Sequence, residues 1–377
     1  TALLVGYCYT HLATRWLSPS RQIVVHAGLL LLTLGLLPVA LPAESLGATS
    51  SPAGHLLWLL TVSLGGPYLA VTTTTPLIQQ WFSGTDHPRA GDPYFLYSVS
   101  NAGSMCGLLA YPFVVELLFD LNVQQTLWSV GYGLLVAMTL TCGFLRFRSR
   151  GRGPDSADPG AVSPGQTVGD VSTLTDEQNA SRQALVSAAR RFRWVLLSFV
   201  PSAALLATTT RITTDVAAVP LFWVLPLAAY LGTYINAFAR RPWLRPEWLA
   251  PAFLPMMCLV AWCSQMSAGS VERAGVETAF FILTALLFHG ELATDRPPAK
   301  HLTEYYFWLA LGGCLGGTLV GLIAPIVFVS NLEFPLTIVA AAFLLKAPGE
   351  LSRVLARILL AMLLVLFTAT ALVDRFL

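Results

Sequence analysis

Long apolar runs, separated by short segments that carry most of the charges, fill this chain from end to end. A helix needs about 20 apolar residues to cross a bilayer, and about twelve runs approach that length, the first of them truncated. None alternates with period two as a barrel strand does, so helices are expected throughout. The runs cover roughly residues 1–14, 23–43, 56–82, 95–119, 126–147, 193–214, 217–239, 250–267, 276–293, 303–328, 335–347 and 354–374.

The composition excludes the other broad classes of protein. Hydrophobic residues make up 55% of the 377 residues and charged residues only 11%, against about 25% charged residues in an average soluble domain. A soluble fold of this length could not bury so much apolar surface. Soluble, disordered, collagen-like and nucleic-acid-binding proteins are therefore excluded. The chain is predicted to be an all-α polytopic membrane protein whose first partner is the lipid bilayer.

The basic residues indicate how the helices are oriented. Six alternate connections hold 19 of the 22 Lys and Arg residues, and an excess of this kind marks cytoplasmic loops. The loops around residues 44–55, 120–125, 268–275 and 329–334 are then expected to face outward. The 19 residues are Arg15, Arg21, Arg89, the eight from Arg146 to Arg193, Arg240, Arg241, Arg245, Arg296, Lys300, Lys346, Arg353 and Arg357.

One of these cytoplasmic connections, residues 148–191, differs from the rest. It begins RSRGRGPDSADPG and is rich in Gly, Pro, Ser and Asp, a composition that predicts a flexible linker. Thr175 and Gln178 have the spacing of a capping box, which predicts a short amphipathic helix at the membrane surface. The linker separates a first membrane half, 1–147, from a second half, 192–347. Residues 348–377 are expected to add one C-terminal helix.

The two halves share short motifs in the same order. T-D-x-P-x-A at 85–90 recurs at 294–299, and W-L-x-P at 16–19 recurs at 243–246. Aromatic residues and a helix rich in small residues follow each T-D-x-P-x-A copy. Because Thr1 opens directly into an apolar run, one helix is expected to precede it. The pattern then predicts a parallel six-plus-six duplication of the major-facilitator type.

Three stretches carry a resemblance to a known family. Residues 83–104, 211–231 and 290–317 resemble the membrane region of bacterial polytopic fused major-facilitator/spermidine synthases. The resemblance covers nearly the whole chain and implies a multi-pass protein of the bacterial inner membrane. Many members of that family also carry a soluble aminopropyltransferase-like domain, which binds its cofactor through a Gly-rich strand–helix turn. This sequence has no counterpart of that turn, since residues 312–317 lie inside a predicted membrane helix, so no cofactor is expected.

Arg211 and Asp215 are the first candidates for a substrate or ion path, because ionisable groups are costly at membrane depth. Their i, i+4 spacing places them on one helix face, where they could pair. Several threonines, including Thr209 and Thr213, surround them. One interpretation is a substrate or ion site lined by hydroxyl groups and one ion pair. The other is an interfacial pair that caps the outer end of a helix.

Three further polar residues are candidates for the same path. Thr73 lies in a run of four threonines before Pro76, where hydroxyl groups either satisfy carbonyls freed by the proline or line a cavity. Asn101 is expected either to bond across helices or to bind ligand. Glu116 is expected either to reach the outer interface or to relay protons.

The remaining motifs indicate packing rather than chemistry. Gly312, Gly313, Gly316 and Gly317 form two overlapping small-xxx-small patterns, which predict close helix packing. The six cysteines all lie in apolar runs and lack a metal-ligand spacing, so no metal site is expected. Nucleophile-elbow, P-loop, dinucleotide and HExxH motifs are absent, and no catalytic residue is assigned.

Three classes of function remain open. The first is a transporter-like module that binds or moves a small polar or cationic solute. The second is a non-catalytic membrane subunit that docks on other membrane subunits of a larger complex. The third is the membrane part of an aminopropyltransferase-like enzyme. A cavity lined by polar residues would favour the first class, and a wide protein interface at lipid level would favour the second.

Overall fold

The computed structural model describes residues 2–38, 52–149, 186–216, 223–263, 271–328 and 333–345. Helices account for 88% of the structure, and no strand occurs among the described residues. The first half contains α1 (Ala2–Trp16), α2 (Pro19–Leu34), α3 (Pro52–Ser83), α4 (Phe95–Ala110), η2 (Tyr111–Val115), α5 (Glu116–Leu118) and α6 (Leu121–Ser149). The second contains α8 (Ala188–Arg211), η5 (Ile212–Val216), α9 (Val224–Phe238), α10 (Pro246–Cys263), α11 (Val271–Thr294), η7 (Ala299–His301), α12 (Leu302–Thr318), η8 (Leu319–Ile323), α13 (Ala324–Val327) and α14 (Glu333–Leu344).

Seven helical segments of the described chain are long and apolar enough to cross a membrane. They are Gly54–Ser83, Phe95–Leu118, Leu121–Arg148, Ala188–Thr214, Pro246–Cys263, Val271–Thr294 and Ala299–Val327. Two shorter apolar helices, α9 and α14, accompany them. The prediction of an all-helical, membrane-compatible chain is confirmed at this level. The count of about twelve spans stays a prediction, and the expected helix 354–374 lies outside the described residues.

The second half begins earlier than expected. Its first helix was predicted at 193–214, but α8 starts at Ala188, where the Ser187 hydroxyl caps the helix by accepting a hydrogen bond from the Arg190 N–H at 3.2 Å. The basic residues Arg190 to Arg193 therefore belong to α8 itself. Most of linker 148–191, including Thr175 and Gln178, lies outside the described residues.

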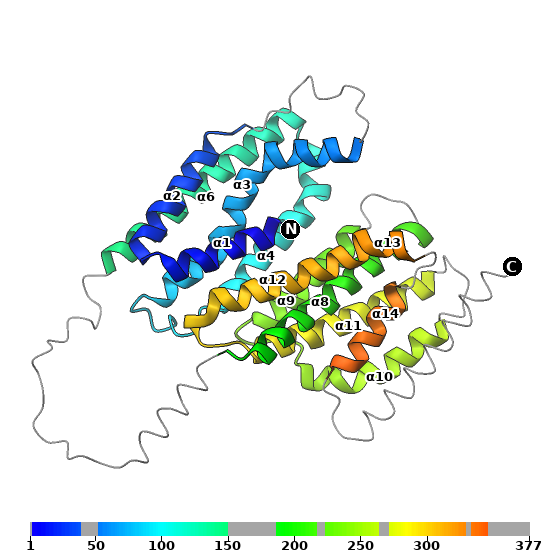
Figure 1. Cartoon of the computed structure of the whole chain (residues 1–377). Coiled ribbons are helices and arrows are strands. Elements are labelled where there is room, and N and C mark those ends of the chain that lie inside the picture. Colours follow the sequence, from blue (N-terminus) through cyan, green and yellow to red (C-terminus); the bar gives the residue numbers. More distant parts are fainter. Residues whose placement is uncertain are drawn as a thin grey trace, which may run out of the picture.

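The helices form two groups that diverge from a shared contact region (Figure 1). The first group contains α1 to α6 and the second contains α8 to α14. The groups meet where α4 packs on α9 and where α1 packs on α12, and α3 also reaches α12. The first half thus contributes α1, α3 and α4 to this contact, and the second half contributes α9 and α12.

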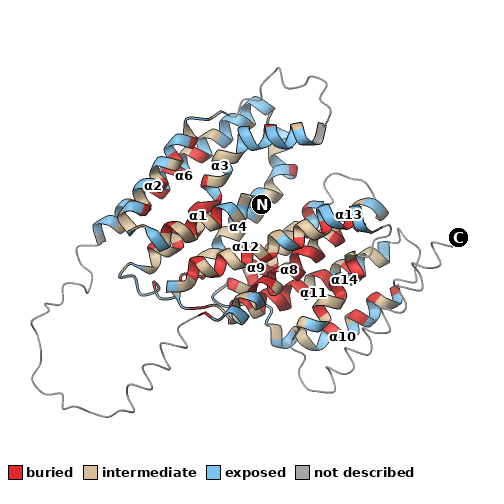
Figure 2. Ribbon diagram, in the orientation of Figure 1, coloured by how far each residue is buried: buried red, intermediate tan, exposed pale blue. Residues whose placement is uncertain are grey.

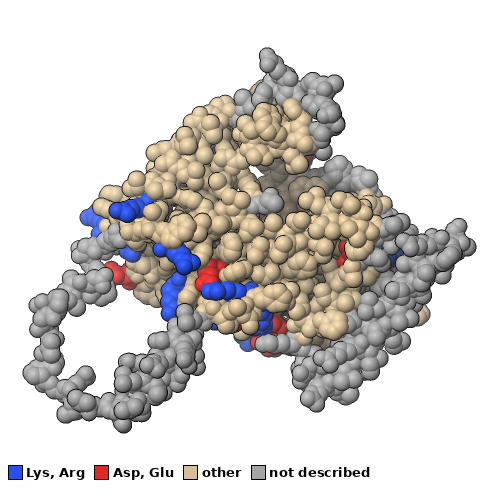
Figure 3. All heavy atoms as spheres, viewed as in Figure 1, with Lys and Arg blue, Asp and Glu red and all other residues tan. Residues whose placement is uncertain are grey.

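Burial is uneven between the two groups (Figure 2). α8 and α11 are the most enclosed helices, and they carry the fully buried Trp194 and Phe288. Large apolar side chains such as Leu117, Trp262 and Ile326 are instead exposed on the outside. Outward-facing apolar side chains suit a lipid environment, because the backbone polar groups of a helix are satisfied internally. On the face seen in Figure 3, the Lys and Arg side chains gather at one end of the molecule.

Candidate functional site

Four tyrosines, from four of the helices that join the two groups, meet in the contact region. Tyr7 comes from α1, Tyr97 from α4, Tyr234 from α9 and Tyr306 from α12. The ring centroids of Tyr97 and Tyr306 lie 4.9 Å apart, those of Tyr7 and Tyr306 6.1 Å, and those of Tyr97 and Tyr234 5.4 Å. These spacings are typical of interacting aromatic pairs. We call these four residues the tyrosine cluster.

The four tyrosines of the cluster lie at matching positions relative to the repeated motifs of the two halves. Tyr97 lies twelve residues after Thr85, and Tyr306 lies twelve residues after Thr294, the first residues of the two T-D-x-P-x-A copies. Tyr7 and Tyr234 likewise each lie nine residues before the tryptophan of a W-L-x-P copy. Exchanging the two halves therefore exchanges the Tyr7–Tyr306 contact with the Tyr234–Tyr97 contact.

Polar groups with few partners surround these rings. The Tyr306 hydroxyl donates a hydrogen bond to Gln79 Oε1 at 2.8 Å, while Gln79 Nε2 is buried without a partner among the described residues. The His289 ring stacks on Tyr234 at 3.6 Å, and its Nδ1 lies 2.8 Å from the Thr233 hydroxyl. The contact region is thus uncharged, aromatic and hydrogen-bonding in character.

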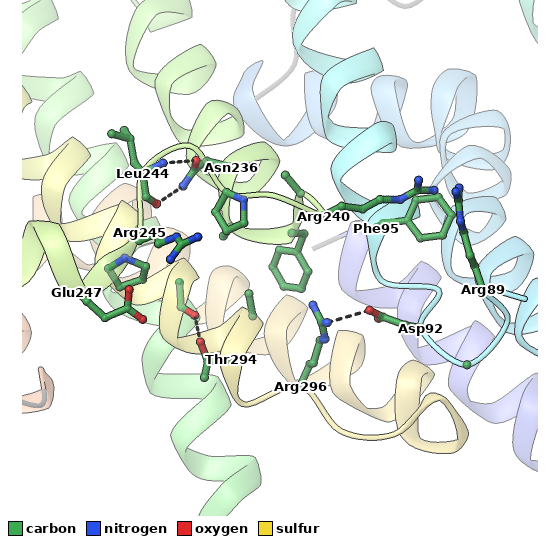
Figure 4. A pocket seen from close by; sticks show the side chains of 18 of the residues that line it. Arg89, Asp92, Phe95, Asn236, Arg240, Leu244, Arg245, Glu247, Thr294 and Arg296 are labelled. Atoms are coloured by element: carbon green, nitrogen blue, oxygen red, sulfur yellow. Dashed lines mark hydrogen bonds and ion pairs between the residues drawn. The ribbon is translucent and has the colours of Figure 1, made fainter.

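A cleft of about 910 Å³ opens beside the tyrosine cluster (Figure 4). Phe238 links the two features, since it lines the cleft and its ring lies 5.1 Å from that of Tyr97. Four arginines line the cleft, together with the carboxylates of Asp92 and Glu247. The four are Arg89, Arg240, Arg245 and Arg296. We call this the arginine cleft; the loops that contribute the arginines are those predicted to be cytoplasmic.

Residues of both groups pair across the arginine cleft. Arg296 Nη2 lies 2.8 Å from Asp92 Oδ2, and the Arg240 guanidinium lies 4.4 Å from the ring centroid of Phe95. Tyr94 donates a hydrogen bond to the Pro297 carbonyl at 2.8 Å. Burial raises the pKa of the Tyr94 phenol, although the nearby Arg296 opposes that shift. Tyr94 is therefore a neutral donor that joins the two T-D-x-P-x-A loops.

The aspartates of the two T-D-x-P-x-A motifs have different surroundings. Asp295 accepts hydrogen bonds from Arg190 Nε and Trp194 Nε1, both at 3.0 Å, and pairs with Arg193 at 3.3 Å. Asp86, its counterpart in the first half, is exposed and forms no ion pair with any described residue. Within the part of the chain that the structure describes, the motif aspartate is therefore ion-paired with a helix in the second half only.

Arg211 has a partner that the sequence did not indicate. Its guanidinium forms an ion pair with Glu277 on α11, and Arg273 Nε lies 3.1 Å from the same carboxylate. Glu277 is only 4% exposed, and the Arg211 guanidinium also lies 5.2 Å from the ring of Phe334 on α14. One buried carboxylate is thus shared by two arginines and joins α8 to α11, while Arg211 itself also contacts α14.

The other residues expected beside Arg211 lie on the same helical segment. The Thr209 hydroxyl donates to the Leu205 carbonyl at 2.7 Å, and the Thr213 hydroxyl donates to the Thr209 carbonyl at 3.0 Å. Asp215 lies in η5, and its side chain is outside the described residues. The i, i+4 pair of Arg211 and Asp215 therefore stays a prediction.

Thr73, Asn101 and Glu116 are not brought together with Arg211. The Thr73 hydroxyl donates to the Ala70 carbonyl of its own helix at 2.8 Å, and Thr73 is fully buried. Asn101 likewise bonds within its own helix, to the Tyr97 carbonyl at 2.8 Å. Glu116 is exposed at the start of α5. Two of these side chains thus serve their own helix, and no single path among the described residues joins the three.

The glycines of α12 lie against α8. A Cβ at Gly312 would overlap Ser198 and the Val195 carbonyl, and a Cβ at Gly316 would overlap the Phe199 carbonyl. Gly313 and Gly317 have more room, since a Cβ at Gly317 would come no closer than 3.6 Å to its neighbours. Gly312 and Gly316 therefore set the separation of the two helices.

Glu277 and the tyrosine cluster are the functional candidates that sequence reasoning missed. The repeat motifs carried a usable signal for the four tyrosines, because each lies at a fixed distance from a motif copy. Glu277 had no comparable signal, since it is separated from Arg211 by 66 residues. Among the described residues, no group of three or more His, Cys, Asp or Glu side chains could hold a metal ion.

Known proteins give no further guidance. No model of a known protein family matches the chain. No curated protein matches it either.

Proposed function

We propose that the chain is a transporter-like membrane module in which a small polar or cationic solute passes between the two helix groups. The tyrosine cluster is the observation that carries this proposal. Its members come from corresponding positions of the two halves and contact one another where the groups meet. A parallel duplication has an axis along the membrane normal, and alternating access then consists of one half rocking against the other.

The helix contacts support the same arrangement. By their positions relative to the two motifs, α1 corresponds to α9, since each precedes a W-L-x-P copy, and α4 corresponds to α12, since each follows a T-D-x-P-x-A copy. A two-fold exchange of the halves then turns the α1–α12 contact into the α9–α4 contact, and both contacts occur. Two equivalent contacts of this kind provide a hinge on either side of an axis.

The chemistry of the contact region favours a neutral or positively charged solute. Aromatic faces attract cations through the ring quadrupole, and four phenol rings converge here. Gln79 Nε2 and His289 Nε2 are buried and have no partner among the described residues. Such groups can form hydrogen bonds with a polar solute.

Distances between the two groups test this proposal. Spin labels at Thr85 and Arg241 report on one end of the molecule, and labels at Leu118 and Val327 report on the opposite ends of their helices. A rocking module should show two distance populations for each pair, and the two pairs should change in opposite directions. Replacing Tyr306 with Ala should increase the population in which the Thr85–Arg241 distance is long, because that change removes a buried contact between the groups.

Tyr111 provides the matched control. It is 49% exposed and lies outside the tyrosine cluster, so Tyr111→Ala should leave both distance distributions as in the parent. A single distance for each pair, unchanged by Tyr306→Ala in both detergent and nanodiscs, would contradict transport by rocking. That outcome would favour a non-transporting membrane subunit.

A further inference from the structure

We propose that the arginine cleft is a binding site for a phosphate-bearing anion. This inference goes beyond the proposed transport function, because it concerns a different place and the opposite charge. The cleft and the tyrosine cluster share Phe238 as a wall but have different polar groups. An anion could therefore bind in the cleft whether or not the two helix groups rock.

The cleft carries positive charge that its own carboxylates do not balance. Four guanidinium groups face two carboxylates. Arg296 pairs with Asp92, whereas Arg89, Arg240 and Arg245 form no ion pair with any described residue. Arginine is the side chain best suited to hold a phosphate, because its planar fork donates parallel hydrogen bonds.

The arginines are held in position by the surrounding structure. Asn236 accepts hydrogen bonds from the backbone N–H groups of Trp243 and Leu244 at 2.9 and 3.0 Å, which fixes the loop that carries Arg240. The side chain of Arg240 runs across the ring of Phe95 towards the end of Arg89 (Figure 4). Arg245 rests on Trp248 at 5.4 Å. The aromatic contacts of Arg240 and Arg245 thus limit the motion of two exposed guanidinium groups, which lowers the cost of ordering them around a ligand.

Charge and size together favour phosphate over a smaller anion. A volume of about 910 Å³ lies in the range of about 300–1,000 Å³ that small-molecule sites occupy. The cleft lies at the ends of α4, α9 and α11, where a membrane surface would lie. A phosphate can therefore come from a soluble phosphorylated molecule or from the headgroup of an anionic lipid. Both sources present the same phosphate group to the arginines, and an experiment can distinguish between them.

Thermal unfolding of the full chain provides the test. One arm measures the unfolding temperature in detergent with inorganic phosphate or pyrophosphate, against chloride at matched ionic strength. The other arm compares nanodiscs of phosphatidylcholine alone with nanodiscs that also contain phosphatidylglycerol. Stabilisation by the soluble anions supports a phosphorylated solute, and stabilisation by phosphatidylglycerol supports a lipid headgroup. No stabilisation in either arm would overturn the proposal.

A matched pair of variants assigns the effect to the cleft. Arg240→Gln removes a lining arginine, whereas Arg241→Gln removes the same charge from its exposed neighbour outside the cleft. Arg240→Gln should weaken the apparent affinity for the stabilising anion by about tenfold or more, and Arg241→Gln by less than about threefold. Arg89→Gln provides a second cleft variant if Arg240→Gln fails to fold. Equal weakening by the cleft and control variants would show general charge screening and overturn the assignment.

Discussion

The ring of Tyr97 on α4 lies 4.9 Å from the ring of Tyr306 on α12, its counterpart in the other half of the chain. In the proposed duplication, a residue that contacts its own counterpart lies close to the axis that relates the two halves, as in the isologous interface of a symmetric dimer. Tyr7 and Tyr234 flank this pair on either side. The contact therefore marks the place where a rotation of one half against the other would be centred.

Substitutions at Tyr306 should distinguish the contribution of the ring to stability from that of the hydroxyl group. Tyr306→Ala leaves a cavity and should reduce the free energy of unfolding by about 3–5 kcal/mol. Tyr306→Phe keeps the ring but removes the donor to Gln79, which should cost about 1 kcal/mol. Thermal or denaturant unfolding of the purified protein in detergent measures both. Equal losses in the two variants would mean that the ring contributes nothing beyond its hydroxyl group.

Glu277 should contribute strongly to the stability of the protein, although it is far from Arg211 in the sequence. Glu277→Gln removes the carboxylate charge that pairs with the buried Arg211 and the half-buried Arg273, which should cost about 3–5 kcal/mol. Glu277→Leu combined with Arg211→Met should be less damaging than the sum of the two single changes. A double-mutant cycle on unfolding measures this coupling. Additive losses would show that the Arg211–Glu277 contact has no energetic consequence.

Adjacent glycines of α12 should respond differently to the same substitution. Gly316→Ala forces a methyl group against the α8 backbone and should destabilise the protein by about 1–3 kcal/mol. Gly317→Ala places the methyl group at ordinary contact distance and should be neutral or stabilise by up to about 1 kcal/mol, since alanine favours helix. Unfolding temperatures of the two variants decide the matter. A neutral Gly316→Ala would mean that α8 and α12 are less closely packed than described.

Substitution of the two motif aspartates, Asp295 and Asp86, should change the stability of the protein by different amounts. Asp295→Asn weakens charge-assisted hydrogen bonds with Arg190, Arg193 and Trp194 and should cost about 1.5–3 kcal/mol. Asp86→Asn, at the exposed counterpart, should change stability by less than about 0.5 kcal/mol. Unfolding in detergent at low and high salt measures both, and added salt should reduce the Asp295 effect because its partners are partly exposed. A loss at Asp86 as large as that at Asp295 would contradict the asymmetry.

Thiol labelling should reveal the orientation of the chain. In a background without the native cysteines, Asn122→Cys lies in the first turn of α6, and Arg241→Cys lies between α9 and α10; both positions are exposed. A membrane-impermeant maleimide should label Asn122→Cys in intact cells, while Arg241→Cys should react only after the cells are opened. The reverse pattern would invert the assigned topology.

Helix positions were largely predictable from the sequence because apolar runs of about 20 residues have few alternatives in lipid. The ends were less predictable. The run 217–239 became α9, Val224–Phe238, among the described residues, and the run 126–147 became α6, which extends over Leu121–Ser149. Polar residues such as Asn122 and basic residues such as Arg148 continue a helix beyond its apolar part, so hydropathy alone underestimates its length.

Polar contacts were harder to predict than helices. The i, i+4 spacing of Arg211 and Asp215 is a local signal, whereas the ion pair with Glu277 depends on how α8 and α11 pack. A single sequence shows which residues share one face of a helix, but it does not show how two helices are aligned against each other. The tyrosine cluster falls between these cases, because the internal repeat gives its four members a recognisable place in the sequence before any packing is known.

The neutrality of the tyrosine cluster has a consequence for temperature. Within a bilayer these ring contacts depend on packing rather than on the release of water, so they are expected to weaken on warming. Ion pairs would respond to added salt instead, and the exposed Arg296–Asp92 pair contributes little between the two groups. The tyrosine contacts should therefore weaken on warming and respond little to ionic strength, so that heat rather than salt is the condition that loosens them.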